Sequence, residues 1–250
     1  MITETSTDRN TVTDVLVGEG PSGRMTRQRQ SQKDPRRLIS LLSTRHTIRI
    51  GTWNVRSMYQ AGKASSIAEE MRNYNLEILG LSDVRWIQSG KCKLSSGETV
   101  LYSGHEDPGA LHTEGVALMI SKHAVRTLIS WEPINSRLIT ALFKTSQGKI
   151  NVRIIQCYAP TNEAEEAIKE EFYNALHSLI ARQRGKEVTI LMGDLNAKIG
   201  GDNREYEFVM GKHGLGEMNE NGELFADLCA NNDLVISGSI FPHKRIHKAT

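Results

Sequence analysis

The organisation of this chain is clearest in the stretch Val188-Thr189-Ile190-Leu191-Met192-Gly193-Asp194-Leu195-Asn196. Its first five residues are β-branched or apolar, which predicts a buried strand, and the run then changes abruptly to a glycine, a carboxylate and a carboxamide. In layered α/β proteins, ligands bind at the carboxyl ends of strands, because polar groups there meet water while the strand behind them is rigid. The stretch therefore predicts a strand that presents Asp194 and Asn196 to a functional site.

Three other predicted strands also end on polar side chains. Asn54 follows the alternating Ile48, Ile50 and Thr52, Asp83 ends the apolar run 77–83, and Tyr158 ends the strand predicted for residues 149–158. If these strands are neighbours, their ends converge on one cleft of oxygen ligands, which suits Mg²⁺ or Mn²⁺ rather than zinc. A hard cation among carboxylates is typical of phosphoryl chemistry, because it polarises the phosphate while a carboxylate orients the attacking water.

Between these ends the sequence alternates helices with many short strands. This pattern favours two stacked β-sheets flanked by helices, an α/β architecture, over a simple parallel sheet. The predicted short strands are residues 98–103, 115–121, 125–131, 137–144, 149–158 and 234–236. The predicted helices are residues 61–74, a long helix beginning near Asn162 as its N-cap, and residues 221–231, with a long surface loop over 200–220.

The first 46 residues differ from the rest in composition. They are rich in Thr, Ser, Gln, Arg and Gly and poor in large apolar groups, which predicts a disordered basic arm, with residues 38–42 as a possible short docking helix. From Arg24 to Arg49 there are eight Arg or Lys residues and a single acid, Asp34. Such a run is typical of a nucleic-acid-binding or nuclear-import segment, and a merely solubilising tail remains the alternative.

The rest of the composition narrows the class of protein. At 250 residues, with a net charge of +2, the chain could hold one large domain or two small ones, and its 38% of hydrophobic residues is enough for a core. We expect one domain over residues 47–250. Cys92, Cys157 and Cys229 are widely spaced and odd in number, so we expect neither a disulfide framework nor a disulfide-linked partner. The start of the chain does not resemble a signal peptide, and no apolar stretch approaches the ~20 residues of a membrane span, so an intracellular protein is expected.

The ordered set of motifs resembles a known superfamily. Over residues 47–250, the set Trp53-Asn54-Val55, Asp83, the run 114–122, Tyr158-Ala159-Pro160 and Gly193-Asp194-Leu195-Asn196 is similar to the endonuclease/exonuclease/phosphatase superfamily. Within it, residues 157–162, 191–200 and 238–250 are most similar to the endonuclease domain of RTE-type non-LTR retrotransposons. The resemblance implies a four-layer sandwich of two mixed β-sheets and a Mg²⁺-dependent phosphodiesterase. We therefore expect an endonuclease that cleaves DNA and leaves a 3′-hydroxyl, and the basic segment adds the expectation that it acts in the nucleus.

The resemblance also implies roles for the residues at the strand ends. Asn54 and Asp83 would help to hold Mg²⁺, or Mn²⁺ in its place; Tyr158 would contact the scissile phosphate. Asp194 would align or deprotonate the nucleophile, and Asn196 would orient Asp194 or the substrate. For Asp194 the residue chemistry alone points the same way, because an attacking water needs a nearby carboxylate.

The sequence departs from the family pattern in two places, and each departure is expected to weaken metal binding or activity. The family has Glu at the position of Asp83, and a carboxylate shorter by one methylene is expected to weaken metal binding. The family's Asp-His pair would lie beyond Thr250, so we expect a domain truncated at its C-terminus, with impaired activity. The alternatives are a phosphatase or phospholipid phosphodiesterase of the same superfamily, and a non-catalytic nucleic-acid or chromatin-binding remnant that uses the basic arm.

Overall fold

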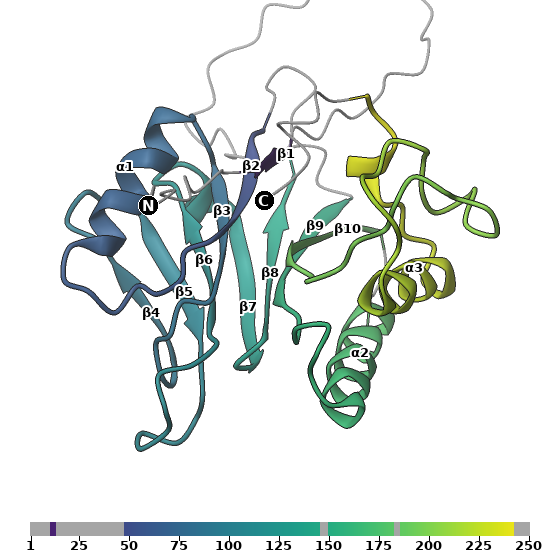
Figure 1. Ribbon diagram of the computed structural model, residues 1–250. Helices are drawn as coiled ribbons and strands as arrows, with labels where there is room; N and C mark the ends of the chain where they lie inside the picture. The colour runs from purple at the N-terminus through teal and green to yellow at the C-terminus, as the bar shows by residue number, and fades with distance from the viewer. Residues whose placement is uncertain (1–10, 14–47, 146–149, 183–185, 243–250) are drawn as a thin grey trace, which may run out of the picture.

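The computed structural model describes residues 11–13, 48–145, 150–182 and 186–242, and two β-sheets stack at its centre (Figure 1). Helix α1 (Lys63–Asn73) packs on the outer face of the six-stranded sheet; α2 (Glu166–Ala181) and α3 (Glu220–Asn231) pack outside the four-stranded sheet. The predicted arrangement of two mixed sheets flanked by helices is confirmed. The first sheet has the order β1 (Thr11–Thr13), β2 (Ile50–Asn54), β3 (Ile78–Ser82), β6 (Val116–Ile120), β5 (Thr99–Ser103), β4 (Ser89–Lys93), and the second β10 (Glu187–Asp194), β9 (Asn151–Tyr158), β8 (Leu138–Lys144), β7 (Leu128–Asn135).

Each sheet contains one parallel pair of strands. Strands β2 and β3 run parallel in the first sheet, and β9 and β10 run parallel in the second, whereas the other pairings in both sheets are antiparallel. Parallel neighbours end at the same edge of their sheet, so each pair brings two carboxyl ends together. Because β10 also lies against β2 and β3 across the stack, the ends of both parallel pairs meet at one edge of the molecule.

Three apolar layers hold the four structural layers together. The central layer fills the space between the sheets, a second lies under α1, and a third lies under α2 and α3. Their fully buried members include Ile78, Leu118, Phe143 and Ile154 in the centre, Ile67 and Leu81 under α1, and Leu176 under α2. Burial of whole Ile, Leu and Phe side chains contributes roughly 1.5–3 kcal/mol each, so these layers are the main source of the rigidity behind the strand ends.

A buried polar network joins the two sheets next to those ends. Gln156 on β9 donates from Nε2 to the hydroxyl of Ser82 on β3 at 2.9 Å, and that hydroxyl donates to the carbonyl of Cys157 at 3.0 Å. Gly80 faces the Gln156 side chain, and a Cβ there would lie 1.8 Å from Gln156 Oε1. The network therefore fixes the position of β3 relative to β9, across the two sheets, immediately before Asp83 and Tyr158.

Two predicted strands differ from the observed ones, and two strands were missed: β4, and β1 in the segment predicted to be disordered. Strand β7 begins at Leu128 rather than residue 125, because Ser121 caps a short 3₁₀ helix, Ala124–Thr127, by accepting the backbone N–H of Ala124. The strand predicted for residues 234–236 is wrong, since Ile236 forms only an isolated bridge with Met210. Strand β4, Ser89–Lys93, was missed because it is a polar strand at the sheet edge.

The long helix also begins later than predicted. Glu165 rather than Asn162 is the N-cap of α2, and the Asn162 side chain instead accepts the backbone N–H of Asn221 at the start of α3. The predicted helix over 221–231 is observed as α3, one residue longer, and its N-cap Asn219 accepts the N–H of Gly222 at 2.9 Å. Between β10 and α3, residues 195–219 contain neither helix nor strand, in agreement with the predicted loop.

The predicted disordered arm, residues 1–46, lies outside the described residues apart from Thr11–Thr13, which form β1 against β2. The short helix proposed for residues 38–42 is likewise outside them. In the described ranges, no helix combines the length and apolar character needed to cross a membrane. Cys92, Cys157 and Cys229 are free thiols, and the last two are buried.

Candidate active site

Asp194 and Asn54 come from different sheets and meet at the edge where the parallel strands end. Asn54 Nδ2 donates to Asp194 Oδ2 at 2.8 Å, and the backbone N–H of Asn196 donates to Asp194 Oδ1 at 3.1 Å. The orientation of the Asn54 amide is determined by the backbone N–H of Arg56, which donates to Asn54 Oδ1 at 3.1 Å. Both carboxylate oxygens of Asp194 are thus held by donors, which fixes the carboxylate without cancelling its charge.

The turn after β10 is tied to the residue that follows β9. Asn196 has a φ of 47°, a left-handed conformation that Asn tolerates, and its Nδ2 donates to the carbonyl of Ala159 at 2.8 Å. The backbone N–H of Ala159 in turn donates to the carbonyl of Asp194 at 2.8 Å. Asp194 pairs directly with Tyr158 in the β9–β10 register. Asp194, Asn196 and Tyr158 are therefore held together by backbone and side-chain hydrogen bonds.

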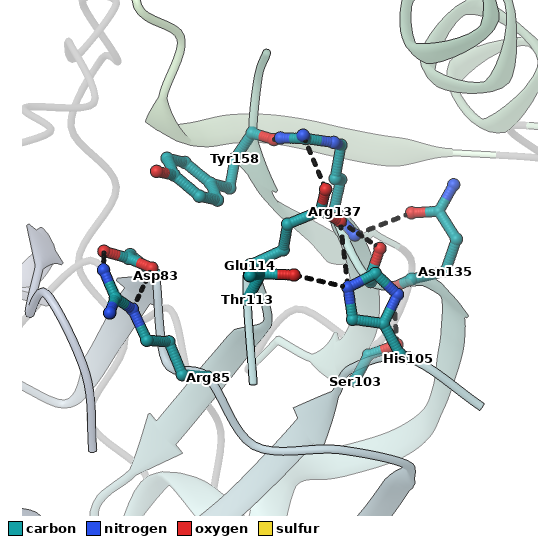
Figure 2. Close-up of polar contacts among 10 residues, drawn as sticks. Asp83, Arg85, Ser103, His105, Thr113, Glu114, Asn135, Arg137 and Tyr158 are labelled. Carbon is teal, nitrogen blue, oxygen red and sulfur yellow. Dashed lines mark hydrogen bonds and ion pairs between the residues drawn. The ribbon is translucent and has the colours of Figure 1, made fainter. Parts of the chain in front are cut away.

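Asp83 follows β3 and is engaged by an arginine two residues later. Arg85 Nε donates to Asp83 Oδ1 at 3.0 Å and Arg85 Nη2 donates to Asp83 Oδ2 at 3.2 Å, so one guanidinium covers both oxygens (Figure 2). Asp83 is 7% exposed, whereas 45% of the Arg85 side chain is exposed. The hydrogen bond to Asp83, and then its charge, raise the pKa of Arg85 further.

A second arginine supports Tyr158 from the opposite side. Arg137 Nη1 donates to the Tyr158 carbonyl at 3.1 Å, and its Cζ lies 5.6 Å from the centroid of the Tyr158 ring. Arg137 Nη2 donates to Glu114 Oε1 at 2.7 Å, while the Ser136 hydroxyl donates to the other Glu114 oxygen. Nε2 of His105 lies 3.7 Å from that second oxygen (Figure 2). Glu114 and its partners therefore fix Arg137 beneath the phenol.

The pKa of Tyr158 reflects this surrounding. Burial raises it above the ordinary tyrosine value, the negative charges of Asp83 and Asp194 raise it further, and the charges of Arg137 and Arg85 act in the opposite direction. A raised pKa keeps the phenol protonated at neutral pH, so Tyr158 is a hydrogen-bond donor there. The strand register pairs Asp194 with Tyr158, and Asp83 lines the same cleft as Tyr158.

The residues of this site surround a cleft of about 360 Å³. Its wall includes Asp83, Arg85, Glu114, Arg137 and Tyr158, together with Ala159 and Thr161 after β9 and Ile168 of α2. Of the predicted residues, Asp83 and Tyr158 line the cleft directly. The cleft is not lined by Asn54, Asp194 or Asn196. They lie next to it, because Asp194 pairs with Tyr158 in the β9–β10 register.

Sequence reasoning assigned no role to Arg85, Arg137 or Glu114. Glu114 opens the run 114–122, and Arg85 follows Asp83 by two residues, so both lay beside recognised motifs. Arg137 begins the predicted strand 137–144 and carried no motif of its own. Their contacts with Asp83 and Tyr158 depend on the turn after β3 and on the register of β8 with β9. No local sequence pattern specifies that turn or that register.

The donor chemistry of the site fits a hard cation, with one condition. Asp83 and Asp194 supply carboxylate oxygens and Asn54 an amide oxygen, which are ligands that Mg²⁺ and Mn²⁺ accept. Within the described ranges, no three His, Cys, Asp or Glu side chains gather closely enough to hold a metal. Since Arg85 bonds both oxygens of Asp83, a cation that used both of them would bind there only after Arg85 had moved.

The arrangement of sheets and strand ends agrees with a family assignment. The Endonuclease/Exonuclease/phosphatase family profile matches residues 51–217. The chain belongs to this family. Craniofacial development protein 2 of Bos taurus is 37% identical over 204 residues, which cover 80% of this chain and 33% of that protein; the Tragulus javanicus protein is also 37% identical, with 34% of its length covered. The chain thus spans about a third of the length of these curated relatives. The resemblance to the superfamily expected from the motifs is confirmed.

The chain is similar to two solved structures to different degrees. The AP endonuclease LMAP from Leishmania major superposes with a TM-score of 0.52 at 12% identity, over 81% of this chain and 75% of that one. The endonuclease domain of TRAS1, a telomere-specific non-LTR retrotransposon, superposes with a TM-score of 0.48 at 14% identity, over 74% of this chain and 70% of that one. At these identities the likeness to LMAP concerns the sandwich architecture alone.

Proposed function

We propose that this chain is a divalent-cation-dependent phosphodiesterase that acts on DNA. The observation that carries the proposal is Asp194, whose two oxygens are held by Asn54 and Asn196 at the edge where two parallel strand pairs end, beside a protonated Tyr158. A fixed, charged carboxylate next to a phenol donor and the fixed guanidinium of Arg137 is suited to hydrolysis of a phosphate ester, because such transfers depend on positioning and electrostatic stabilisation.

In this proposal each residue has a defined task. Asp194 accepts a proton from the attacking water or orients that water, Asn54 and Asn196 keep its carboxylate in place, and the Tyr158 phenol donates to a phosphate oxygen. Arg137 holds Tyr158 through its carbonyl and ring. Asp83 and the Asn54 amide oxygen are the proposed ligands of Mg²⁺, or of Mn²⁺. A cation there would supply positive charge to the phosphate oxygens.

Both polar atoms of the Asn54 side chain have hydrogen-bond partners, which bears on its proposed role as a cation ligand. The Asn54 oxygen accepts the Arg56 N–H, and its nitrogen faces Asp194. The observed contact supports a positioning role for Asn54 toward Asp194, and in a ligand role its amide oxygen would use the lone pair that the Arg56 N–H leaves open.

DNA is proposed as the substrate because of the motif resemblance and the basic segment. The eight Lys and Arg residues between Arg24 and Arg49 would supply phosphate contacts and a nuclear-import signal. LMAP, which shares the sandwich architecture, is named an AP endonuclease, and that name agrees with DNA as the substrate. A fluorescent fusion that loses nuclear accumulation when residues 24–49 are deleted would support the localisation, and unchanged accumulation would contradict it.

Nicking of supercoiled plasmid DNA tests the proposal. We expect Mg²⁺-dependent nicking by the 250-residue chain, and a loss of at least ~100-fold in Asp194→Asn, which keeps the shape of the side chain but removes its charge. Asp202→Asn is the matched control, because Asp202 is an exposed carboxylate held by Arg204 in the loop after β10. The proposal fails if the chain does not nick DNA, or if both variants behave alike.

The same assay separates the alternatives. Turnover of small phosphoesters or of phospholipids without nicking would indicate a phosphatase or phospholipid phosphodiesterase. DNA binding that depends on salt, survives Asp194→Asn, disappears on deletion of residues 24–49 and comes without nicking would indicate a non-catalytic nucleic-acid-binding protein.

A further inference from the structure

Asp83 and Arg85 form a closed pair inside the cleft. The carboxylate is almost fully buried, and the guanidinium meets it in the planar fork geometry that suits a carboxylate best, at 3.0 and 3.2 Å. Both residues line the cleft. The guanidinium occupies the forked position between the two oxygens, so a divalent cation that binds both oxygens there competes with Arg85.

The backbone around the pair is fixed, whereas the arginine side chain has room to move. Asp83 and Arg85 have φ angles of 55° and 61°. The N–H of Val84 donates to the carbonyl of Gly115 at 2.9 Å, and the N–H of Arg85 donates to the carbonyl of Glu114 at 2.7 Å. The Arg85 side chain is 45% exposed. Rotation about side-chain bonds alone would therefore carry the guanidinium from Asp83 into the open cleft, with no refolding of the turn.

The opposite wall of the cleft contains the second guanidinium. Arg137 is 20% exposed in its side chain and is bonded to Glu114 and to the Tyr158 carbonyl, so it is a fixed charge. The Arg85 guanidinium is bonded to Asp83 and is half-exposed, so it is the movable charge of the two. A guanidinium freed from Asp83 would join Arg137 beside Tyr158, where two positive groups suit a phosphate.

We propose that Arg85 is an internal counter-ion of Asp83: a divalent cation that binds Asp83 displaces it, and the freed guanidinium then contacts a phosphate group of DNA in the cleft. Both halves rest on the proposed function, the first on its cation site at Asp83 and the second on DNA as its substrate. In the cation-free protein Arg85 neutralises a buried carboxylate that would otherwise be costly, and in the loaded protein the cation takes over that task. Cation and DNA then bind cooperatively, since each favours the same position of Arg85.

Manganese binding to the full chain tests the first half, with free Mn²⁺ counted by electron paramagnetic resonance. Arg85→Gln removes the competitor and is expected to tighten Mn²⁺ binding by roughly threefold to tenfold, the range of a half-exposed ion pair. Arg137→Gln removes an equal charge from the same cleft without touching Asp83 and is the matched control. In an Asp83→Asn background, Arg85→Gln should have no effect. Circular dichroism verifies that each variant is folded.

Three outcomes overturn this half of the proposal. They are equal tightening by Arg137→Gln, unchanged or weaker binding in Arg85→Gln, and an undiminished effect of Arg85→Gln in the Asp83→Asn background. Arg85→Lys gives a further check if the Gln variant does not fold, because a lysine keeps the charge but covers one oxygen less well. It should tighten Mn²⁺ binding by less than about threefold, and a weakening would also contradict the proposal.

Binding of a short fluorescent DNA duplex tests the second half, measured by anisotropy with and without Ca²⁺. Without cation, wild type and Arg85→Gln should bind DNA equally, because Arg85 is occupied by Asp83. With Ca²⁺, wild type should gain about two- to fivefold more affinity than Arg85→Gln, the contribution of one phosphate contact. Equal loss with and without cation overturns this half. Tighter Mn²⁺ binding by Arg85→Gln, together with absence of nicking by the unaltered chain, would refute the proposed function and would still support Arg85 as the counter-ion of Asp83.

Discussion

Replacing Gly193 by alanine should damage the site from behind, through the backbone of the neighbouring strand. Gly193 immediately precedes Asp194 and has a φ of 144°, a conformation that residues other than glycine rarely adopt. A Cβ at this position would lie 2.1 Å from the carbonyl oxygen of Cys157, its partner in the parallel β9–β10 ladder. The overlap is with backbone, so no side-chain rotation can relieve it, and β10 must move by about 1 Å.

The magnitude follows from two costs that the structure separates. The unfavourable φ costs about 1–3 kcal/mol, and disturbing one or two ladder hydrogen bonds costs about 1 kcal/mol each. We therefore expect Gly193→Ala to lower the free energy of unfolding by about 3–4 kcal/mol, a large part of the ~5–15 kcal/mol of a typical domain. The same shift would lengthen the 2.8 Å contact between Asn54 Nδ2 and Asp194 Oδ2.

Urea unfolding followed by circular dichroism measures the change. Gly62→Ala is the matched control, because Gly62 also has a positive φ, 85°, but a Cβ added there would meet no atom within 4 Å. The control bears the conformational cost alone, about 1–2 kcal/mol. If Gly193→Ala loses no more stability than Gly62→Ala, then the close approach of β10 to β9 does not constrain Gly193, and the argument for a rigid unit at Asp194 fails.

Three further predictions concern the sheet interface, the phenol and the thiols. Gly80→Ala should lower the free energy of unfolding in urea by about 2 kcal/mol, because its Cβ would displace buried Gln156 from its hydrogen bonds; an unchanged midpoint would contradict this. Ultraviolet titration, compared with the Tyr158→Phe variant, should show that Tyr158 ionises above pH ~10, and Asp83→Asn should lower the pKa of Tyr158. The contribution of the Tyr158 phenol to stability is present below pH ~10 and is lost as the pH rises through its raised native pKa. Ellman's reagent should label Cys92 first in the native protein and all three cysteines only in urea, since burial raises the pKa of Cys229 to about 12 and Cys157 is fully buried; rapid labelling of all three would refute the packing.

The strand ends could be predicted from the sequence because their signal is local. A buried strand needs a continuous apolar run, and the change to Gly193-Asp194-Leu195-Asn196 marks its end without reference to the rest of the chain. The strand is observed as Glu187–Asp194, and Asp194 lies at its last position. Tyr158 likewise ends β9 as predicted. The convergence of these ends needed only the rule that parallel strands finish at one edge.

The errors arose where tertiary contacts outweigh local preference. Asn162 is a residue type that often caps helices, yet its side chain accepts the N–H of Asn221 at the start of another helix. The N-cap of α2 is Glu165 instead. Strand β4 lacks the apolar alternation of a strand because it lies at the sheet edge, where pairing with β5 alone defines it. Neither outcome depends on the propensities of nearby residues, so no local pattern could have indicated them.

The Asp83 position shows a different gap between residue chemistry and structure. From the sequence, Asp83 in place of glutamate was expected to weaken metal binding because the carboxylate is shorter by one methylene. The structure adds a competitor, because a turn with φ of 55° at Asp83 and 61° at Arg85 aims the guanidinium at both carboxylate oxygens. Reach and competition are distinct causes of weak binding. Only competition is relieved by changing Arg85, so the proposed cation site is expected to respond to a residue that is not itself a ligand.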